Sequence, residues 1–239
     1  MNILDRYGIK EVADVTFYEI ADNGEAGAPV LYLDTLKVST IEQTAESTSA
    51  RGGKGNPELI MWDYGKEITV TLEDALFSAK SMALMYGVDI NNTSDFDKET
   101  TILKTVKPSQ VSSDGSKITI NGQDFTVSGS VTYYDENGSS TTNKASAAYA
   151  TAKITVSGQK IVISSDKFPK TYYITGDTYA RSEATGKDEF FQFIIPKAKM
   201  QSEVTLTMEA EGDPSTFNMS LKVLRPADGD MMKLVKYSI

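Results

Sequence analysis

The chain has 239 residues, enough for one large domain or two smaller ones, and its 40% hydrophobic and 24% charged residues are typical of an ordered globular protein. It has no histidine and no cysteine, which excludes disulfides, zinc–thiolate sites and catalytic triads that need either residue. Its net charge of −9 argues against tight binding to nucleic acid, because such binding requires a basic surface.

Membrane and secretory segments are not predicted either. The longest apolar runs, such as residues 190–195, fall far short of the ~20 residues that cross a bilayer. The N-terminus MNILDRYGIKEV has no basic region followed by an apolar block.

The N-terminal part of the chain predicts two strands and a long loop. Residues 12–21 and 30–39 read as strands on either side of the turn-rich residues 22–27. Residues 39–57 (STIEQTAESTSARGGKGNP) are too polar for a core and read as a structureless loop. Loops longer than ~12 to 15 residues are usually functional or disordered, so we expect this loop to contact another protein. Its charged residues are the predicted contact residues: Glu42, Glu46, Arg51 and Lys54.

A strand and the one predicted helix follow. Ile68, Val70 and Leu72 alternate with polar residues, which predicts a strand with one apolar face. Residues 73–87 (EDALFSAKSMALMYG) predict a helix that begins with acidic residues and ends at Gly87. Its predicted packing face is formed by Leu76, Ala79, Met82, Ala83 and Tyr86.

The middle of the chain, residues 91–186, is rich in Ser, Thr, Gly and Asn, with turn signals at short intervals. We predict an inserted β-rich surface module there, between the two parts of a main β domain formed by residues 1–90 and 187–239. The alternative is that these strands extend the main sheet. The strands expected in this segment are residues 117–120, 124–133, 152–156 and 160–163.

The C-terminal part predicts a hairpin. Residues 204–208 and 217–223 both alternate apolar with polar residues around a turn at 211–214. The fold class expected from the whole chain is therefore mainly β, with one short helix.

Several apparent motifs do not support a binding site. The stretch Arg51-Gly52-Gly53-Lys54-Gly55 lacks the spacing of a phosphate-binding loop. Asp228-Gly229-Asp230 and Asp135-Glu136-Asn137 read as acidic turns rather than metal sites. Trp62, the single tryptophan, reads as a core anchor at the start of a strand rather than a sugar-stacking platform. We therefore predict no catalytic, cofactor-binding or metal-binding residues.

Two stretches of the chain, TLKVSTIEQTAESTSARGGKGNPELIMWDYGKEITVTLEDALFSAKSMALMYG and FFQFIIPKAKMQSEVTLTMEAEGDPSTFNMSLKVLRP, resemble the tail tube (major tail) proteins of long-tailed bacteriophages. The resemblance lies in the order and character of the elements, and it covers the two ends of the chain but not the middle. It implies a β-sandwich or barrel whose sheets join around a ring, usually a hexamer, with rings stacked into a tube.

The resemblance also implies a role and a location. The protein would be a structural component of the virion tail, made in the bacterial host cytoplasm, and a passive conduit for DNA during ejection. Its partners would be further copies of itself and other tail proteins, namely the tape measure, tail terminator and baseplate; whether a sheath is also a partner stays open. An acidic surface would suit a lumen that DNA passes without sticking, although solubility alone explains the charge equally well.

Three alternatives remain open from the residues. One is another tail component, such as a baseplate or head–tail joining protein, on the same fold. Another is a β-sandwich binding module, an adhesin or carbohydrate-binding domain, in which Trp62, Tyr133 or Tyr134 lines the ligand site. The third is a hydrolase that uses a close pair of buried carboxylates with separated pKa values.

Overall fold

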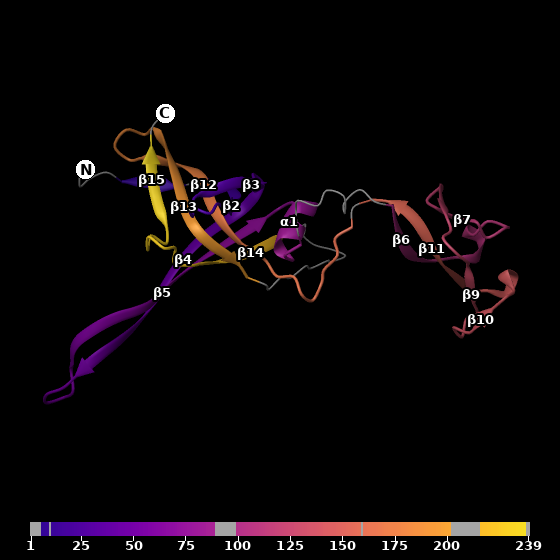
Figure 1. Ribbon diagram of the computed structural model, residues 1–239, viewed down its shortest axis with the longest axis horizontal. Helices are drawn as coiled ribbons and strands as arrows, with labels where there is room; N and C mark the ends of the chain where they lie inside the picture. The colour runs from indigo at the N-terminus through magenta and orange to yellow at the C-terminus, as the bar shows by residue number, and fades with distance from the viewer. Residues whose placement is uncertain (1–5, 10, 89–98, 159, 202–215, 238–239) are drawn as a thin grey trace. The chain divides into compact units, whose positions relative to one another are not determined.

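The computed structural model describes residues 6–9, 11–88, 99–158, 160–201 and 216–237 (Figure 1). The chain forms two compact units: Met1–Ile90 together with Ile163–Ile239, called the main unit here, and Asn91–Val162, called the inserted unit. Both units consist mainly of antiparallel β-strands, which confirms the predicted fold class.

The main unit contains a nine-stranded sheet in which seven strands follow the order β3-β2-β12-β13-β14-β5-β4, while β1 pairs with β12 and β15 pairs with β13. The strands are β1 (Tyr7–Ile9), β2 (Asp14–Ile20), β3 (Ala26–Leu33), β4 (Leu36–Arg51), β5 (Glu58–Asp74), β12 (Thr171–Ser182), β13 (Asp188–Met200), β14 (Phe217–Val223) and β15 (Lys233–Tyr237).

The sheet encloses one apolar core. Its two outermost strands in this order, β3 and β4, are joined by residues 34–35, and buried side chains of both belong to the same core cluster as those of the central strands. The sheet therefore curves so that its ends come together around the core, as in a β-sandwich. The apolar residues predicted from alternation in β5 and β14, such as Val70, Leu72 and Leu221, are all buried.

The prediction that residues 39–57 form a long polar loop is wrong. Residues up to Arg51 belong to β4, which pairs with β5 in register from Leu36↔Asp74 to Arg51↔Glu58. Only residues 52–57 form the connection between the strands. Exposed Ser and Thr side chains dominate this part of β4, so the sequence shows no alternation of apolar and polar residues there. Hydrogen bonds to β5 hold the strand in place.

The predicted strand at residues 30–39 is two strands, because the chain turns at residues 34–35 between β3 and β4. The strand predicted at 12–21 is confirmed as β2. In the C-terminal hairpin, 217–223 is confirmed as β14, which pairs with β13 and β5; the other predicted arm, 204–208, lies outside the described residues.

The predicted helix begins later than expected. Helix α1 covers Ala79–Met85, because Glu73 and Asp74 still belong to β5 and Ser78 caps the helix N-terminus. The buried residues of α1 are Ser81, Ala83, Leu84 and Met85, so of the predicted packing face only Ala83 is fully buried.

The predicted C-terminal stop at Gly87 is confirmed. Gly87 has φ +72°, and the N–H groups of Gly87 and Val88 donate to the carbonyls of Leu84 and Ala83, which is the Schellman pattern. A Cβ at Gly87 would lie 2.2 Å from the backbone carbon of Phe168, so glycine is required here by packing as well as by conformation.

The inserted unit has its own small core. Its strands are β6 (Glu99–Val106), β7 (Lys117–Ile120), β8 (Gln123–Thr126), β9 (Thr132–Tyr134), β10 (Ser140–Thr141) and β11 (Tyr149–Ser157). They form a sheet of order β10-β9-β11-β6 and the β7–β8 hairpin, and the short 3-10 helices η2 (Pro108–Gln110) and η3 (Lys144–Ser146) lie between them. Buried residues such as Ile118, Ala150 and Ile154 form a core cluster separate from that of the main unit.

The strands predicted in the middle segment have mixed outcomes. Residues 117–120 match β7, and 152–156 lie within β11. Residues 124–133 are divided between β8 and β9, and 160–163 form no strand. Strand β12 pairs with β2 and β13 in the main sheet, so the main unit resumes before residue 186, where we placed the end of the insertion.

The Asp114 carboxylate holds the turn that precedes β7. The Asp114 carboxylate accepts hydrogen bonds from the Ser112 and Ser116 hydroxyls at 2.5 and 2.7 Å and from the Ser116 N–H at 3.0 Å. These bonds, first the one from the Ser112 hydroxyl, lower the pKa of Asp114 because they favour its ionised form. The stabilisation is therefore present at neutral pH and is lost as the pH falls below about 4, where aspartate in the unfolded chain takes up a proton.

We expect Asp114→Ala to speed amide hydrogen exchange at Ser116 at pH 6, measured by NMR. The amide of Gly138, in a separate turn, should be unchanged and serves as the control. The difference in unfolding free energy between wild type and variant should shrink as the pH falls below about 4. A difference that grew on acidification would contradict the assigned role of the ionised carboxylate.

Candidate functional site

The β4–β5 hairpin extends beyond the sheet as a two-stranded ribbon (Figure 1). We call residues 45–66, the part beyond the Thr44↔Glu67 pair, the arm. None of its residues belongs to the core cluster of the main unit. At roughly 3.3 Å per residue, its nine β5 residues, Glu58–Lys66, reach about 30 Å beyond the sheet.

The four residues predicted as subunit contacts are all exposed, but they occupy different parts of the hairpin. Glu42 lies opposite Thr69, before the arm begins, and Glu46 lies opposite Tyr64 within the arm. Arg51 pairs with Glu58 across the hairpin, whereas Lys54 is in the connection between the strands. Their contact role stays a prediction. The glycine-rich stretch that includes Lys54 leads into a strand and not a helix, so it lacks the context of a phosphate-binding loop.

Sequence reasoning missed a group of apolar residues in the arm. Leu59, Ile60, Met61, Trp62 and Tyr64 are each more than half exposed, Trp62 by 52%. The prediction that Trp62 anchors the core is wrong, because no second layer of the described main unit packs on this part of β5. The signal that could have revealed them is the apolar run Leu59–Trp62, which lies N-terminal to the alternating residues of β5 and is separated from them by residues 63–67.

The apolar residues of the arm are not equivalent. Side chains alternate between the two faces of a strand, so Ile60, Trp62 and Tyr64 share one face, which we call the Trp62 face. Their partners Ala50, Thr48 and Glu46 lie on that same face of β4. Met61 and Asp63 lie on the other. A lone two-stranded ribbon is at best marginally stable in water, so an uncovered apolar face of this kind indicates a contact surface.

The face of the sheet opposite the core, called the polar face here, carries polar side chains on most of its strands. It carries Thr16, Thr175, Ser220, Thr71 and Thr40 on β2, β12, β14, β5 and β4, none of them buried. Charges of both signs lie on this face: Glu67 pairs with Lys222, and Lys222 lies opposite Lys199. Ile194 lies opposite Thr175 and Phe190 lies opposite Tyr179, so the polar face also includes apolar side chains and is not uniformly acidic.

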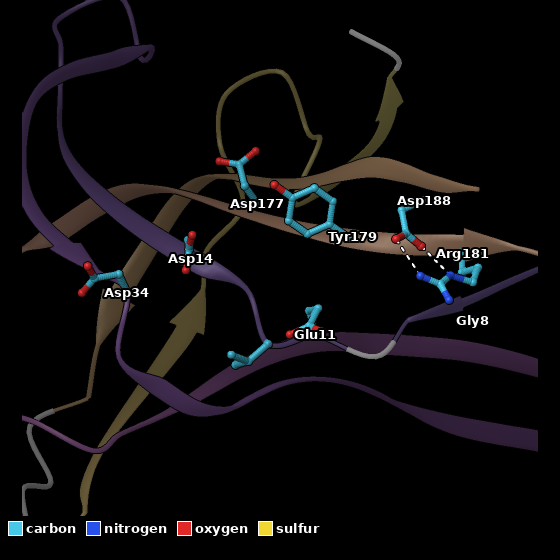
Figure 2. A pocket seen from close by; sticks show the side chains of 9 residues that line it. Gly8, Glu11, Asp14, Asp34, Asp177, Tyr179, Arg181 and Asp188 are labelled. Carbon is cyan, nitrogen blue, oxygen red and sulfur yellow. Dashed lines mark hydrogen bonds and ion pairs between the residues drawn. The ribbon is translucent and has the colours of Figure 1, made fainter. Parts of the chain in front are cut away.

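Acidic residues gather where β2 and β12 meet. A hollow of about 660 Å³ is lined by Glu11, Asp14, Asp34 and Asp177 together with Gly8, Val12, Tyr179, Arg181 and Asp188 (Figure 2). Asp14 and Asp177 are direct cross-strand partners, which is unfavourable because their like charges repel each other. Hydrogen bonds offset it in part: Gln192 Nε2 donates to Asp177 at 2.9 Å, and the Tyr32 hydroxyl donates to Asp14 at 3.4 Å.

The charges around this hollow shift nearby pKa values. The negative charge of Asp14 raises the pKa of Tyr32, because it opposes formation of the phenolate. At the other end of the hollow, Arg181 donates to both oxygens of Asp188 at 2.7 and 2.8 Å, which lowers the pKa of that carboxyl. Within the described residues, no group of three or more Asp and Glu side chains is arranged to hold a metal ion.

The chain's terminal strands lie at the edge of the sheet. Lys236 of β15 contacts Glu189 of β13 at 2.5 Å and the hydroxyl of Tyr7 of β1, and these bonds, the one to Glu189 first, raise the pKa of Lys236. In the described part of the sheet, β1, β3, β4 and β15 each pair along one side only. Their other edges offer unpaired backbone groups to another chain.

The structure also shows the surroundings of the tyrosines of the binding-module hypothesis and of the two acidic turns. Tyr134 stacks on Tyr149 with ring centroids 5.2 Å apart, and both rings are half-buried, as is Tyr133. Asp135 accepts bonds from the N–H groups of Asn137 and Ser139, as expected of a turn. Asp228 and Asp230 both lie within 4.0 Å of Lys233.

The hydrolase hypothesis requires a close pair of buried carboxylates. Among the described residues, Asp74 is the one carboxylate that is buried, so this part of the chain offers no such pair. Asp74 accepts hydrogen bonds from the Thr35 hydroxyl at 2.6 Å and the Leu76 N–H at 3.2 Å, which is a structural role at the end of β5. No helix in the described part of the chain is long and apolar enough to cross a membrane.

Comparison with known proteins identifies the family. The model of the YomU/Tube protein family matches residues 7–236, a range that includes the middle segment left out of the resemblance seen in the sequence. The tail tube protein of Bacillus phage SPR is 24% identical over 252 aligned positions, which cover 95% of this chain and 87% of that protein. Since the family match extends over almost the whole chain, the protein belongs to the YomU/Tube protein family.

Proposed function

We propose that the protein is a structural subunit of a phage tail tube, which self-assembles into stacked rings and forms a passive conduit for DNA during ejection. The observation that carries this proposal is the family match over residues 7–236, with a tail tube protein as a relative along 95% of the chain. The structure supports it with two features that serve assembly: a sheet with free edges and an exposed arm.

Each feature has a role in the proposed assembly. The free edges of the sheet meet those of neighbouring copies, which removes the unpaired backbone groups and closes a ring. The arm, with Glu46, Arg51 and Lys54, reaches from one ring to the next, and Glu42 lies at its base. Mixed charges in such a contact fix register and orientation more than they add affinity.

The polar face of the sheet is the surface we assign to the lumen. Its Thr and Ser side chains remain hydrated, as a water-filled channel requires, and the acidic hollow beside β2 and β12 repels phosphate. Lys199 and Lys222 lie on the same face, so repulsion is local and does not extend over the whole surface. The subunit has no catalytic role, and its further partners are the tape measure, tail terminator and baseplate proteins within the virion.

The test is negative-stain electron microscopy of the purified protein at high concentration, with its mass measured by light scattering. Rings or hollow tubes are expected. A protein that stays strictly monomeric at high concentration, and that gives no tubes when mixed with preformed tail assemblies, would overturn the proposal.

The inserted unit is proposed to be a decoration on the outside of the tube that assembly does not need. It has its own core, so replacing Asn91–Val162 with a short Gly/Ser linker should leave the main unit folded. We expect this variant to unfold cooperatively by circular dichroism and to form tubes of reduced diameter by electron microscopy. Loss of tubes from a folded variant would place the inserted unit within the subunit contacts instead.

A further inference from the structure

We propose that the Trp62 face of the arm docks on the α1 end of the next copy, and that this apolar contact holds the rings together. This inference rests on the proposed function. We call the surface formed by Leu76, Phe77 and Lys80 the α1 end. The partner is therefore a second copy of this chain, and the contact joins opposite ends of β5.

The Trp62 face of the arm is apolar and uncovered. Ile60, Trp62 and Tyr64 are 55%, 52% and 53% exposed, although they lie in one row on the same face of the ribbon. Large aromatic side chains that are exposed in one subunit are the usual anchors of protein contacts. The core cluster of the chain's own main unit includes none of the arm residues, so the cover comes from another molecule.

A second exposed apolar surface lies at the other end of β5. Leu76 and Phe77 directly follow β5 and are 65% and 59% exposed. Figure 1 shows the arm leaving one end of β5 and α1 lying near the other end. A contact between opposite ends of one subunit repeats from copy to copy without closing, which is what a tube of stacked rings requires.

The two surfaces are complementary in shape and charge. Beside Lys80 lies a hollow of about 340 Å³ that is lined by Pro29, Val30, Leu31, Tyr32, Ser78 and Lys80. Its apolar and aromatic lining suits an indole ring, and Lys80 can contact the ring face through a cation–π interaction. Glu46 lies on the Trp62 face and Lys80 lies at the α1 end, so the two surfaces also carry opposite charges.

The single tryptophan makes the contact directly measurable. Trp62 is the only tryptophan of the chain, so its fluorescence reports on the arm alone. On assembly we expect its emission to shift to shorter wavelength and its quenching by acrylamide to fall several-fold. Assembly without either change would overturn the inference but not the proposed function, whereas a protein that gives no tubes alone or with preformed tail assemblies would overturn both.

Substitutions on the two faces of the arm provide a matched comparison. Trp62→Ser should raise the concentration needed for assembly by about 30-fold or more, as expected for the loss of a central aromatic anchor. Met61→Ser changes a neighbouring residue of similar exposure on the other face. It should raise the concentration needed for assembly less than about twofold. Equal effects of the two substitutions would overturn the inference. Both variants should keep the wild-type circular dichroism spectrum.

Crosslinking identifies the docking partner. The chain has no cysteine, so single cysteines can be introduced into an inert background. Thr48 lies opposite Trp62 on the same face, so a mixture of Thr48→Cys and Phe77→Cys proteins, assembled and treated with a short bismaleimide, should yield a dimer joining the two variants. A mixture of Met61→Cys and Phe77→Cys proteins should not. Tubes in which neither mixture gives that product would show that the arm docks elsewhere.

Discussion

Replacing residues 45–66 with Asn-Gly should give a folded protein that no longer stacks into tubes. The replacement removes the arm and closes the hairpin at the Thr44↔Glu67 pair, where a two-residue Asn-Gly turn suits antiparallel strands. At concentrations at which the wild-type protein forms tubes, light scattering should report nothing larger than a single ring, and electron microscopy should show no tubes.

The fold should survive because the arm adds nothing to the core. Buried residues of β5 begin at Ile68, beyond the deleted segment, and the core cluster includes no residue of the arm. The free energy of unfolding should therefore change by less than about 1 kcal/mol, the range of changes at exposed positions. If the shortened protein is unfolded, the arm is needed for folding and the division of roles is wrong.

A tip-trimmed protein is the control for this deletion. Replacing residues 52–57 with Asn-Gly removes Lys54 but keeps the Arg51↔Glu58 pair and the whole Trp62 face. This protein should still form tubes if the apolar face of the arm makes the contact. Loss of tubes would instead assign the contact to the charged connection at the tip of the hairpin.

Phe17→Ala should lower the free energy of unfolding of the main unit by about 3–5 kcal/mol, the loss typical of a buried phenylalanine. Phe17 is fully buried in β2 and meets Tyr172 of β12 edge-to-face, with ring centroids 6.0 Å apart. Removing its ring leaves a cavity between strands that pair directly, Phe17 with Ile174, so the surrounding sheet cannot easily close over it.

The measurement requires a protein that does not assemble, because assembly would stabilise the folded subunit by mass action. The substitution is therefore best made in the armless protein, at a concentration at which light scattering reports a monomer, with urea unfolding followed by circular dichroism. Tyr32→Ala, on the neighbouring strand β3 and 58% exposed, is the control and should cost less than about 1 kcal/mol. A loss below about 1.5 kcal/mol for Phe17→Ala would show that the core relaxes around the cavity.

The helix and the arm show where sequence patterns mislead. Residues 73–87 contain good helix formers throughout, yet pairing of β5 with β14 at Phe217↔Asp74 keeps the first residues in a strand. Glu73 and Asp74, which the sequence places in an acidic first turn of the helix, are therefore the last residues of strand β5. In the arm, the polar residues of β4 read as a loop because neither face of the ribbon packs on the core. Apolar and polar residues alternate along a strand only where one of its faces is buried.

The amino-acid sequence by itself determined the mainly β fold, the buried faces of β5 and β14, the stop at Gly87 and the tail tube resemblance, because local alternation and turn residues encode these features. Only the tertiary structure decided that β12 belongs to the main sheet, that residues 39–51 are a strand and that Trp62 is exposed. These three outcomes depend on which distant strands pair and on what covers each face. A strand's own residues do not specify its neighbours, so packing had to supply that information.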